Sequence, residues 1–121
     1  MDLTGLSAVG EYRESFNTAT GQNLPCGTIY QSAGLETHVR KRHPDGLKNL
    51  DYVEEIIASP DYIGKNPKEP NSVELVKILD NNVMVCIKLD TSKGYFFVAS
   101  VYSISEGKLK NRLHSGRLKA I

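Results

Sequence analysis

The stretch SVELVKILDNNVMVCIKLDTSKGYFFVASVYSI, residues 72–104, decides the fold of this chain. It contains three β-prone runs, at residues 72–79, 82–89 and 95–104. Only a short polar turn separates each run from the next, and connections this short join neighbouring antiparallel strands. The stretch therefore predicts a three-stranded antiparallel meander.

The middle run of this meander has two unlike faces, because successive side chains of a strand point in opposite directions. One face is wholly apolar and consists of Val83, Val85, Ile87 and Leu89. The other consists of Met84, Cys86 and Lys88. We expect helices to cover the apolar face and Lys88 to lie on the open one.

Upstream of the meander, Gly34 precedes LETHVRKRH, residues 35–43, and Pro44 ends it. Leu35 and Val39, four residues apart, predict a short basic helix with a narrow apolar stripe flanked by His38 and His43. A second helix is expected from about residue 50 to 58. Its apolar positions at helical spacing are Leu50, Val53, Ile56 and Ile57.

The remaining segments complete a prediction of a single domain. Residues 1–26 are polar and are expected to be a leader or linker, whereas residues 27–121 form the domain, beginning with a short strand at 27–31. Residues 61–71, rich in proline, are expected to be a loop. The predicted fold is α+β, with two N-terminal helices packed on an antiparallel sheet of about four strands.

Composition limits the classes of function. The chain has 121 residues, 40% of them hydrophobic, and no apolar run near the roughly 20 residues that cross a membrane. Cys26 and Cys86 lack metal-ligand spacing and are expected to be free thiols. Phosphate-binding glycine loops, HExxH and paired CxxC motifs are absent from the sequence, which disfavours nucleotide-cofactor enzymes and zinc hydrolases.

The formal net charge is only +1, but the basic residues are clustered. One cluster lies in the first predicted helix and at its exit, and the other fills the C-terminal stretch. Two such clusters could meet as a phosphate-binding surface, although charge runs are more often solvated faces. The clusters are Arg40, Lys41, Arg42 and Lys48, and Lys108, Lys110, Arg112, Arg117 and Lys119.

The order of these pieces resembles the phage-associated branch of the barnase, EndoU, colicin E5/D and RelE-like nucleases. The matching pieces are LETHVRKRHP, YVEEIIASPDYI, SVELVKIL and YFFVASVYSI, at residues 35–44, 52–63, 72–79 and 95–104. The resemblance implies a barnase- or RelE-like fold and a ribonuclease of toxin or effector type that needs no metal or other cofactor. In such enzymes a base removes the proton of the RNA 2′-hydroxyl, whose oxygen attacks the adjacent phosphate, and an acid protonates the leaving oxygen.

Histidine suits either proton transfer because its pKa lies near ambient pH. His38 is the first choice for this role and His43 the second, with Lys88, Ser100 and Tyr102 as further catalytic candidates. The candidates for substrate binding are Arg40, Arg42, Ser103, Lys65 and Arg117.

Plainer interpretations remain open for these residues. His43 could simply favour the helix dipole, His38 could bond a backbone carbonyl, and Lys88 could be a solvated strand position. The rival function is a binding module without catalysis, for nucleic acid or protein, such as an inhibitor of a host system. A toxin would act in the cytoplasm of a target or host cell, with RNA and an acidic immunity or antitoxin protein as partners and no membrane.

Overall fold

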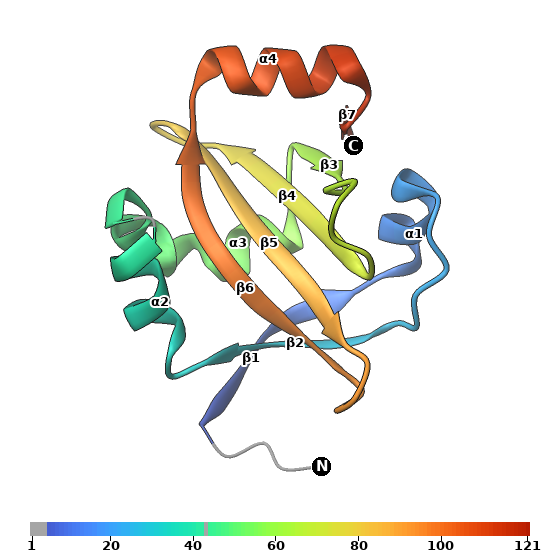
Figure 1. Ribbon diagram of the computed structural model, residues 1–121, viewed down its shortest axis with the longest axis vertical. Coiled ribbons are helices and arrows are strands. Elements are labelled where there is room, and N and C mark those ends of the chain that lie inside the picture. The colour runs from blue at the N-terminus through green and yellow to red at the C-terminus, as the bar shows by residue number, and fades with distance from the viewer. Residues whose placement is uncertain (1–4, 43) are drawn as a thin grey trace.

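The computed structural model describes residues 5–42 and 44–121 and shows an α+β architecture built around one mixed sheet (Figure 1). In these residues the sheet has seven strands, in the order β1-β2-β6-β5-β4-β3-β7. The strands are β1 (Leu6–Tyr12), β2 (Gly27–Ser32), β3 (Tyr62–Gly64), β4 (Ser72–Ile78), β5 (Asn82–Asp90), β6 (Tyr95–Ile104) and β7 (Leu118–Ala120). The helices are α1 (Glu14–Thr20), α2 (Leu35–Arg42), the 3-10 helix η1 (Pro44–Tyr52), α3 (Val53–Ala58) and α4 (Glu106–Ser115).

The predicted meander is present as β4, β5 and β6, which run antiparallel to one another. Val85 of β5 lies opposite Leu75 on one side and Val101 on the other, and all three side chains are fully buried. Gly94 turns the chain between β5 and β6 with φ 79°, a left-handed conformation that glycine adopts without strain. The alternation of β-branched residues is therefore sufficient to set this part of the sheet.

The short basic helix predicted from Leu35 and the short strand predicted from Gly27 are present as α2 and β2. The predicted numbers of strands and helices and the purely antiparallel sheet were wrong. The sheet is mixed, because β2 runs parallel to β6, and in the described residues it has seven strands and four α-helices instead of about four strands and two helices. The strands β3 and β7 have three residues each, too few to show a periodic pattern. The strand β3 also lies inside the proline-rich stretch that was expected to be a loop.

Residues 6–20 differ from the expected leader, because they form β1 and α1 and contribute to the core. Tyr12 and Phe16 are each only 1% exposed, and the Tyr12 ring stacks on Phe96 of β6 at 4.4 Å between centroids. Tyr12 also donates a hydrogen bond to the buried Asn17 at 2.7 Å. Although the segment is polar in composition, its two large aromatic side chains are buried in the core.

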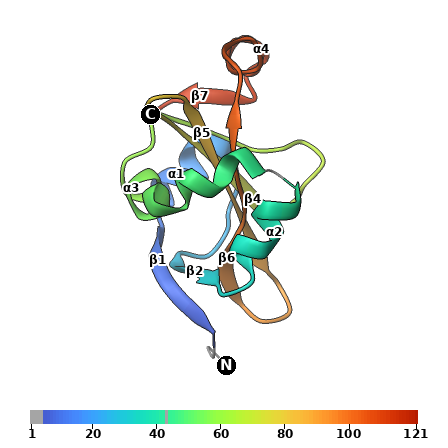
Figure 2. The same ribbon diagram turned by 90° about the vertical axis from the view of Figure 1, so that its left-hand side faces the viewer.

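The two faces of the sheet carry separate apolar clusters. The larger cluster lies on the face that carries Val85, which we call the first face. It packs this face against α1, α2 and α3 through residues such as Phe16, Val39 and Ile56. The smaller cluster, on the second face, packs Met84 and Ile104 against Leu109 of α4. Figures 1 and 2 show α4 crossing one end of the sheet beside β7, so this helix covers only part of the second face. No described helix is long and apolar enough to span a bilayer.

The position of α2 follows from the short pairing of β2 with β6. The two strands pair at Ile29 with Phe96 and Tyr30 with Phe97. Beyond this register, α2 and η1 contact β6 instead of another strand, and Figure 1 shows α2 beside that edge. A helix at a sheet edge can bury one stripe against the first face while presenting its adjoining stripe to the second.

Candidate functional site

A pocket of about 550 Å³ opens beside the part of the second face that α4 leaves uncovered. We call it the catalytic-candidate pocket. Strands β4, β5 and β6 form its floor, while α2 and the loop at residues 65–71 form its walls. Five residues that the sequence analysis singled out line it, namely His38, Arg42, Lys88, Ser100 and Tyr102.

The floor is polar because strand register aligns polar side chains from three strands. Glu74 of β4 lies opposite Cys86 of β5, which lies opposite Ser100 of β6. One step along the same face, Ser72 lies opposite Lys88. The register shifts between Cys86 and Ile87, so β6 carries an extra residue just before Ser100. Such a bulge bends a strand and redirects the side chain beside it.

Ser100 has an unusual environment. The residue is only 9% exposed, and its Oγ is buried with no hydrogen-bond partner among the described residues. A buried hydroxyl left unpaired costs about 1–3 kcal/mol, and most such groups in proteins are paired. Ser100 lines the pocket, so a turn of its side chain toward the cavity would let an oxygen of a bound ligand satisfy the hydroxyl.

The wall formed by α2 presents a histidine and an arginine one helical turn apart. Leu35 and Val39 are buried, at 3% and 0% exposure, and hold the helix on the core. His38 and Arg42, four residues apart on the adjoining stripe, are exposed and line the pocket. The helix therefore supplies a group for proton transfer and a permanent positive charge on one side of the cavity.

The opposite wall supplies an acidic residue, Glu69, that is paired with Lys88. The Lys88 ammonium forms an ion pair with Glu69 at 2.8 Å, and both side chains are partly exposed, at 38% and 46%. Exposed pairs of this kind contribute little to stability, typically below about 1 kcal/mol. An anionic ligand can therefore replace Glu69 at Lys88 at small cost.

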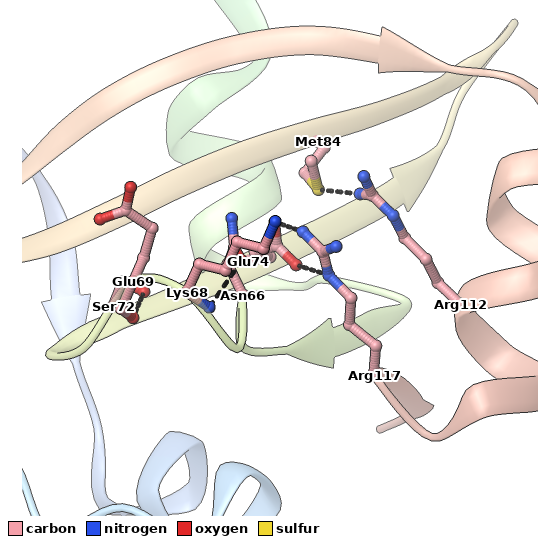
Figure 3. Close-up of polar contacts among 8 residues, drawn as sticks. All are labelled: Asn66, Lys68, Glu69, Ser72, Glu74, Met84, Arg112 and Arg117. Carbon is pink, nitrogen blue, oxygen red and sulfur yellow. Dashed lines mark hydrogen bonds and ion pairs between the residues drawn. The ribbon is translucent and has the colours of Figure 1, made fainter.

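A second acidic residue of the pocket, Glu74 in the floor, is hydrogen-bonded to an arginine from the C-terminal segment (Figure 3). Arg117 donates to both carboxylate oxygens, from Nε at 2.9 Å and from a terminal nitrogen at 2.8 Å. Only 3% of the Glu74 side chain and 23% of the Arg117 side chain are exposed. The hydrogen bond with Glu74 raises the pKa of Arg117 above its usual value.

Two further groups of the pocket stay protonated at neutral pH. Burial, together with the neighbouring Glu74, raises the pKa of the Cys86 thiol to about 12. Burial and Cys86 raise the pKa of Tyr102 to about 12, and the opposing effect of Arg112 is smaller. Tyr102 is thus a hydrogen-bond donor at neutral pH, and Cys86 is not a thiolate nucleophile.

The structure places four other predicted site residues outside this pocket. Arg40 pairs with Glu36 on the exposed side of α2 at 2.9 Å. Ser103 lies on the opposite face of β6, where its hydroxyl accepts hydrogen bonds from Asn49 and Asn81. Lys65 and Arg117 line a second pocket, and His43 lies outside the described residues.

Several residues of the site escaped the sequence analysis. Glu74 had a usable signal, since a carboxylate inside the apolar run SVELVKIL needs a buried partner. Glu69 and Asn66 had none, because a loop gives no face on which to place a side chain. Within residues 5–42 and 44–121, no three His, Cys, Asp or Glu side chains group to hold a metal ion.

A comparison with protein families finds one match that covers most of the chain. The model of the family described as phage-Barnase-EndoU-ColicinE5/D-RelE like nuclease3 matches residues 7–111. No curated protein and no solved structure matches significantly. The match begins within β1, so it includes residues 7–26 of the segment that was expected to be a leader.

Proposed function

Because this chain belongs to the phage-Barnase-EndoU-ColicinE5/D-RelE like nuclease3 family, we propose that it is a ribonuclease acting in the catalytic-candidate pocket without a metal ion. The observation that carries the proposal is the convergence of His38, Arg42 and Lys88 around the unpaired hydroxyl of Ser100. These groups provide a proton acceptor, positive charge and a hydrogen-bond donor. Phosphoryl transfer within RNA needs all three.

The first step is attack within the RNA strand itself. His38 accepts the proton of the 2′-hydroxyl as that oxygen forms a bond to the adjacent phosphorus. Negative charge grows on the non-bridging oxygens, where Arg42 and Lys88 stabilise it and Ser100 donates a hydrogen bond. Lys88 turns from Glu69 to the phosphate during binding.

The second part of the step is departure of the 5′-oxygen. The bond from phosphorus to this oxygen breaks, and the oxygen takes a proton from the Tyr102 hydroxyl. Solvent then returns a proton to Tyr102 and takes up the proton that His38 holds, which restores both groups. The products are a 2′,3′-cyclic phosphate and a free 5′-hydroxyl. The raised pKa of Tyr102, about 12, keeps its proton in place until the more basic leaving alkoxide develops.

Cleavage of RNA in EDTA tests the proposal. We expect the purified protein to cut single-stranded RNA and to leave intact the same strand with a deoxyribose at the scissile position. Removing the imidazole in His38→Ala should lower kcat by about 10²–10⁴-fold, the usual contribution of a positioned proton-transfer group. Tyr102→Phe should lower kcat by about tenfold or more.

The matched control is His114→Ala, which removes an exposed histidine of α4 that does not line the pocket. Its activity should equal that of the wild type. Tight RNA binding by the wild type with no cleavage product would overturn the ribonuclease proposal in favour of a binding module. Equal losses in both histidine variants would remove His38 from the mechanism.

A further inference from the structure

A second pocket, of about 490 Å³, lies next to the catalytic-candidate pocket and has an unusual charge. Its lining includes three basic residues, Lys65, Arg117 and Lys119, and no acidic residue. This contrasts with the first pocket, in which Glu69 and Glu74 accompany the cations. We call it the basic pocket.

The strand pairing explains why the cations meet there. Ile63 of β3 lies opposite Lys119 of β7, and Gly64 lies opposite Leu118. Lys65 follows Gly64 and Arg117 precedes Leu118, so this pairing brings both to the same end of the two strands. Gly64 permits this approach, because a Cβ at that position would collide with the carbonyl oxygen of Arg117. Residues far apart in sequence are therefore held together by backbone pairing.

The two pockets adjoin through shared walls. Glu74 lines the first pocket and its bidentate partner Arg117 lines the basic pocket, as Figure 3 helps to follow. The loop contributes Asn66 to the first pocket and Lys65 and Pro67 to the basic pocket. The loop and the pair of Glu74 with Arg117 therefore form a wall common to the two pockets.

The charges that remain after pairing show what the basic pocket can bind. Glu74 neutralises Arg117, whereas Lys65 and Lys119 form no ion pair within the described part of the chain. Two uncompensated ammonium groups in a concave site favour a phosphate. We infer that the basic pocket binds a second phosphate of the same RNA strand whose scissile phosphate occupies the catalytic-candidate pocket.

This inference rests on the proposed function, and it makes single-stranded RNA longer than a dinucleotide the preferred substrate. The test measures binding of fluorescent 2′-deoxy oligonucleotides, which the proposed reaction leaves uncut, by anisotropy over a range of salt concentrations. In the double variant Lys65→Ala/Lys119→Ala, affinity for an octanucleotide should fall about tenfold while affinity for a dinucleotide stays unchanged. The plot of log affinity against log salt should flatten by about 0.7 for each lost phosphate contact.

The control removes the same charge elsewhere. Lys108→Ala/Lys110→Ala deletes two exposed cations of α4 that line neither pocket, and it should change octanucleotide affinity less than twofold. Lys65→Arg/Lys119→Arg keeps the charge and should retain wild-type binding, which separates loss of charge from loss of fold. Equal losses in both alanine doubles would overturn the inference, because general attraction would then explain the binding.

Cleavage assays separate this inference from the proposed function. If the wild type cuts RNA and Lys65→Ala/Lys119→Ala has an unchanged KM for long RNA, the basic pocket is not part of the substrate site and the ribonuclease proposal stands. The opposite outcome is a wild type that cuts no RNA but binds longer strands more tightly, with that preference lost only in Lys65→Ala/Lys119→Ala. The second phosphate site then stands and the ribonuclease proposal fails.

Discussion

At the residue scale, the pocket floor contains a thiol, that of Cys86, whose protonation depends on burial. Cys86 lies among Glu74, Ser100 and Tyr102, and its pKa is raised from the ordinary value of 9.0 to about 12. Between these two values the unfolded chain loses the thiol proton and the folded chain keeps it. The free energy of unfolding must therefore fall as pH rises above about 9.

Cys86→Ser removes this contribution because a serine hydroxyl does not ionise in that range. Between pH 9 and 10 the wild type should lose about 1 kcal/mol more of its free energy of unfolding than Cys86→Ser. Urea unfolding under reducing conditions at both pH values measures the difference. Cys26→Ser, at an exposed cysteine, should follow the wild type, and a Cys86→Ser curve parallel to the wild type would contradict the assignment.

Residue patterns in the sequence indicated several of the side chains that line the pocket. Strand parity put Lys88 on the open face and paired Ser100 with Tyr102, and helical spacing put His38 and Arg42 on one side of α2. Parity separates Ser100 from Ser103, which lie on opposite faces of β6. It does not show which of the two faces carries the pocket. Glu69 could not be placed at all, since its position depends on how a proline-rich loop folds back on β5.

At the element scale, the structure depends on close backbone pairing of β3 with β7. Gly64 is the critical position, since an added Cβ would meet the Arg117 carbonyl oxygen. Gly64→Ala must push the strands apart, and overpacking of this kind costs about 1–3 kcal/mol. We expect a lower midpoint in urea and weaker binding of the octanucleotide, because Lys65 and Lys119 would separate.

Gly107→Ala is the matched control for this glycine substitution. Gly107 lies in α4, and an added Cβ there would meet nothing within 4 Å. Alanine favours a helix over glycine by up to about 1 kcal/mol, so this variant should be as stable as the wild type or more stable. Equal destabilisation by both substitutions would show that the contact at Gly64 is not tight.

The same scale explains why some elements were predicted and others were not. Strands β4, β5 and β6 are neighbours in sequence and in the sheet, so their alternation and turns suffice. The pairs β2 with β6 and β3 with β7 join segments more than fifty residues apart, and only tertiary packing selects them. In β1, register shifts between Ala8 and Gly10, which interrupts the alternation that would have identified a strand.

At the scale of the whole molecule, the C-terminal segment is tied to the centre of the sheet by Arg117 and Glu74. Arg117→Met should cost about 2–3 kcal/mol, because it leaves the 3%-exposed Glu74 carboxylate without its partner. Glu74→Gln/Arg117→Met removes both charges and should recover at least half of that loss. Urea unfolding of the wild type, both single variants and the double variant measures the coupling, and strictly additive losses would contradict it.

If the pocket binds RNA as proposed, the ion pair between Lys88 and Glu69 has a consequence for the anions that can compete with it. A chloride ion or a small carboxylate carries no more charge than the side chain that it must replace, so it gains nothing by entering. A phosphodiester chain arrives with several charges on one molecule, and contacts made by its other phosphates offset the displacement of Glu69. Under the proposed function, the small cost of displacing Glu69 would thus be offset for an RNA strand and not for a monovalent anion.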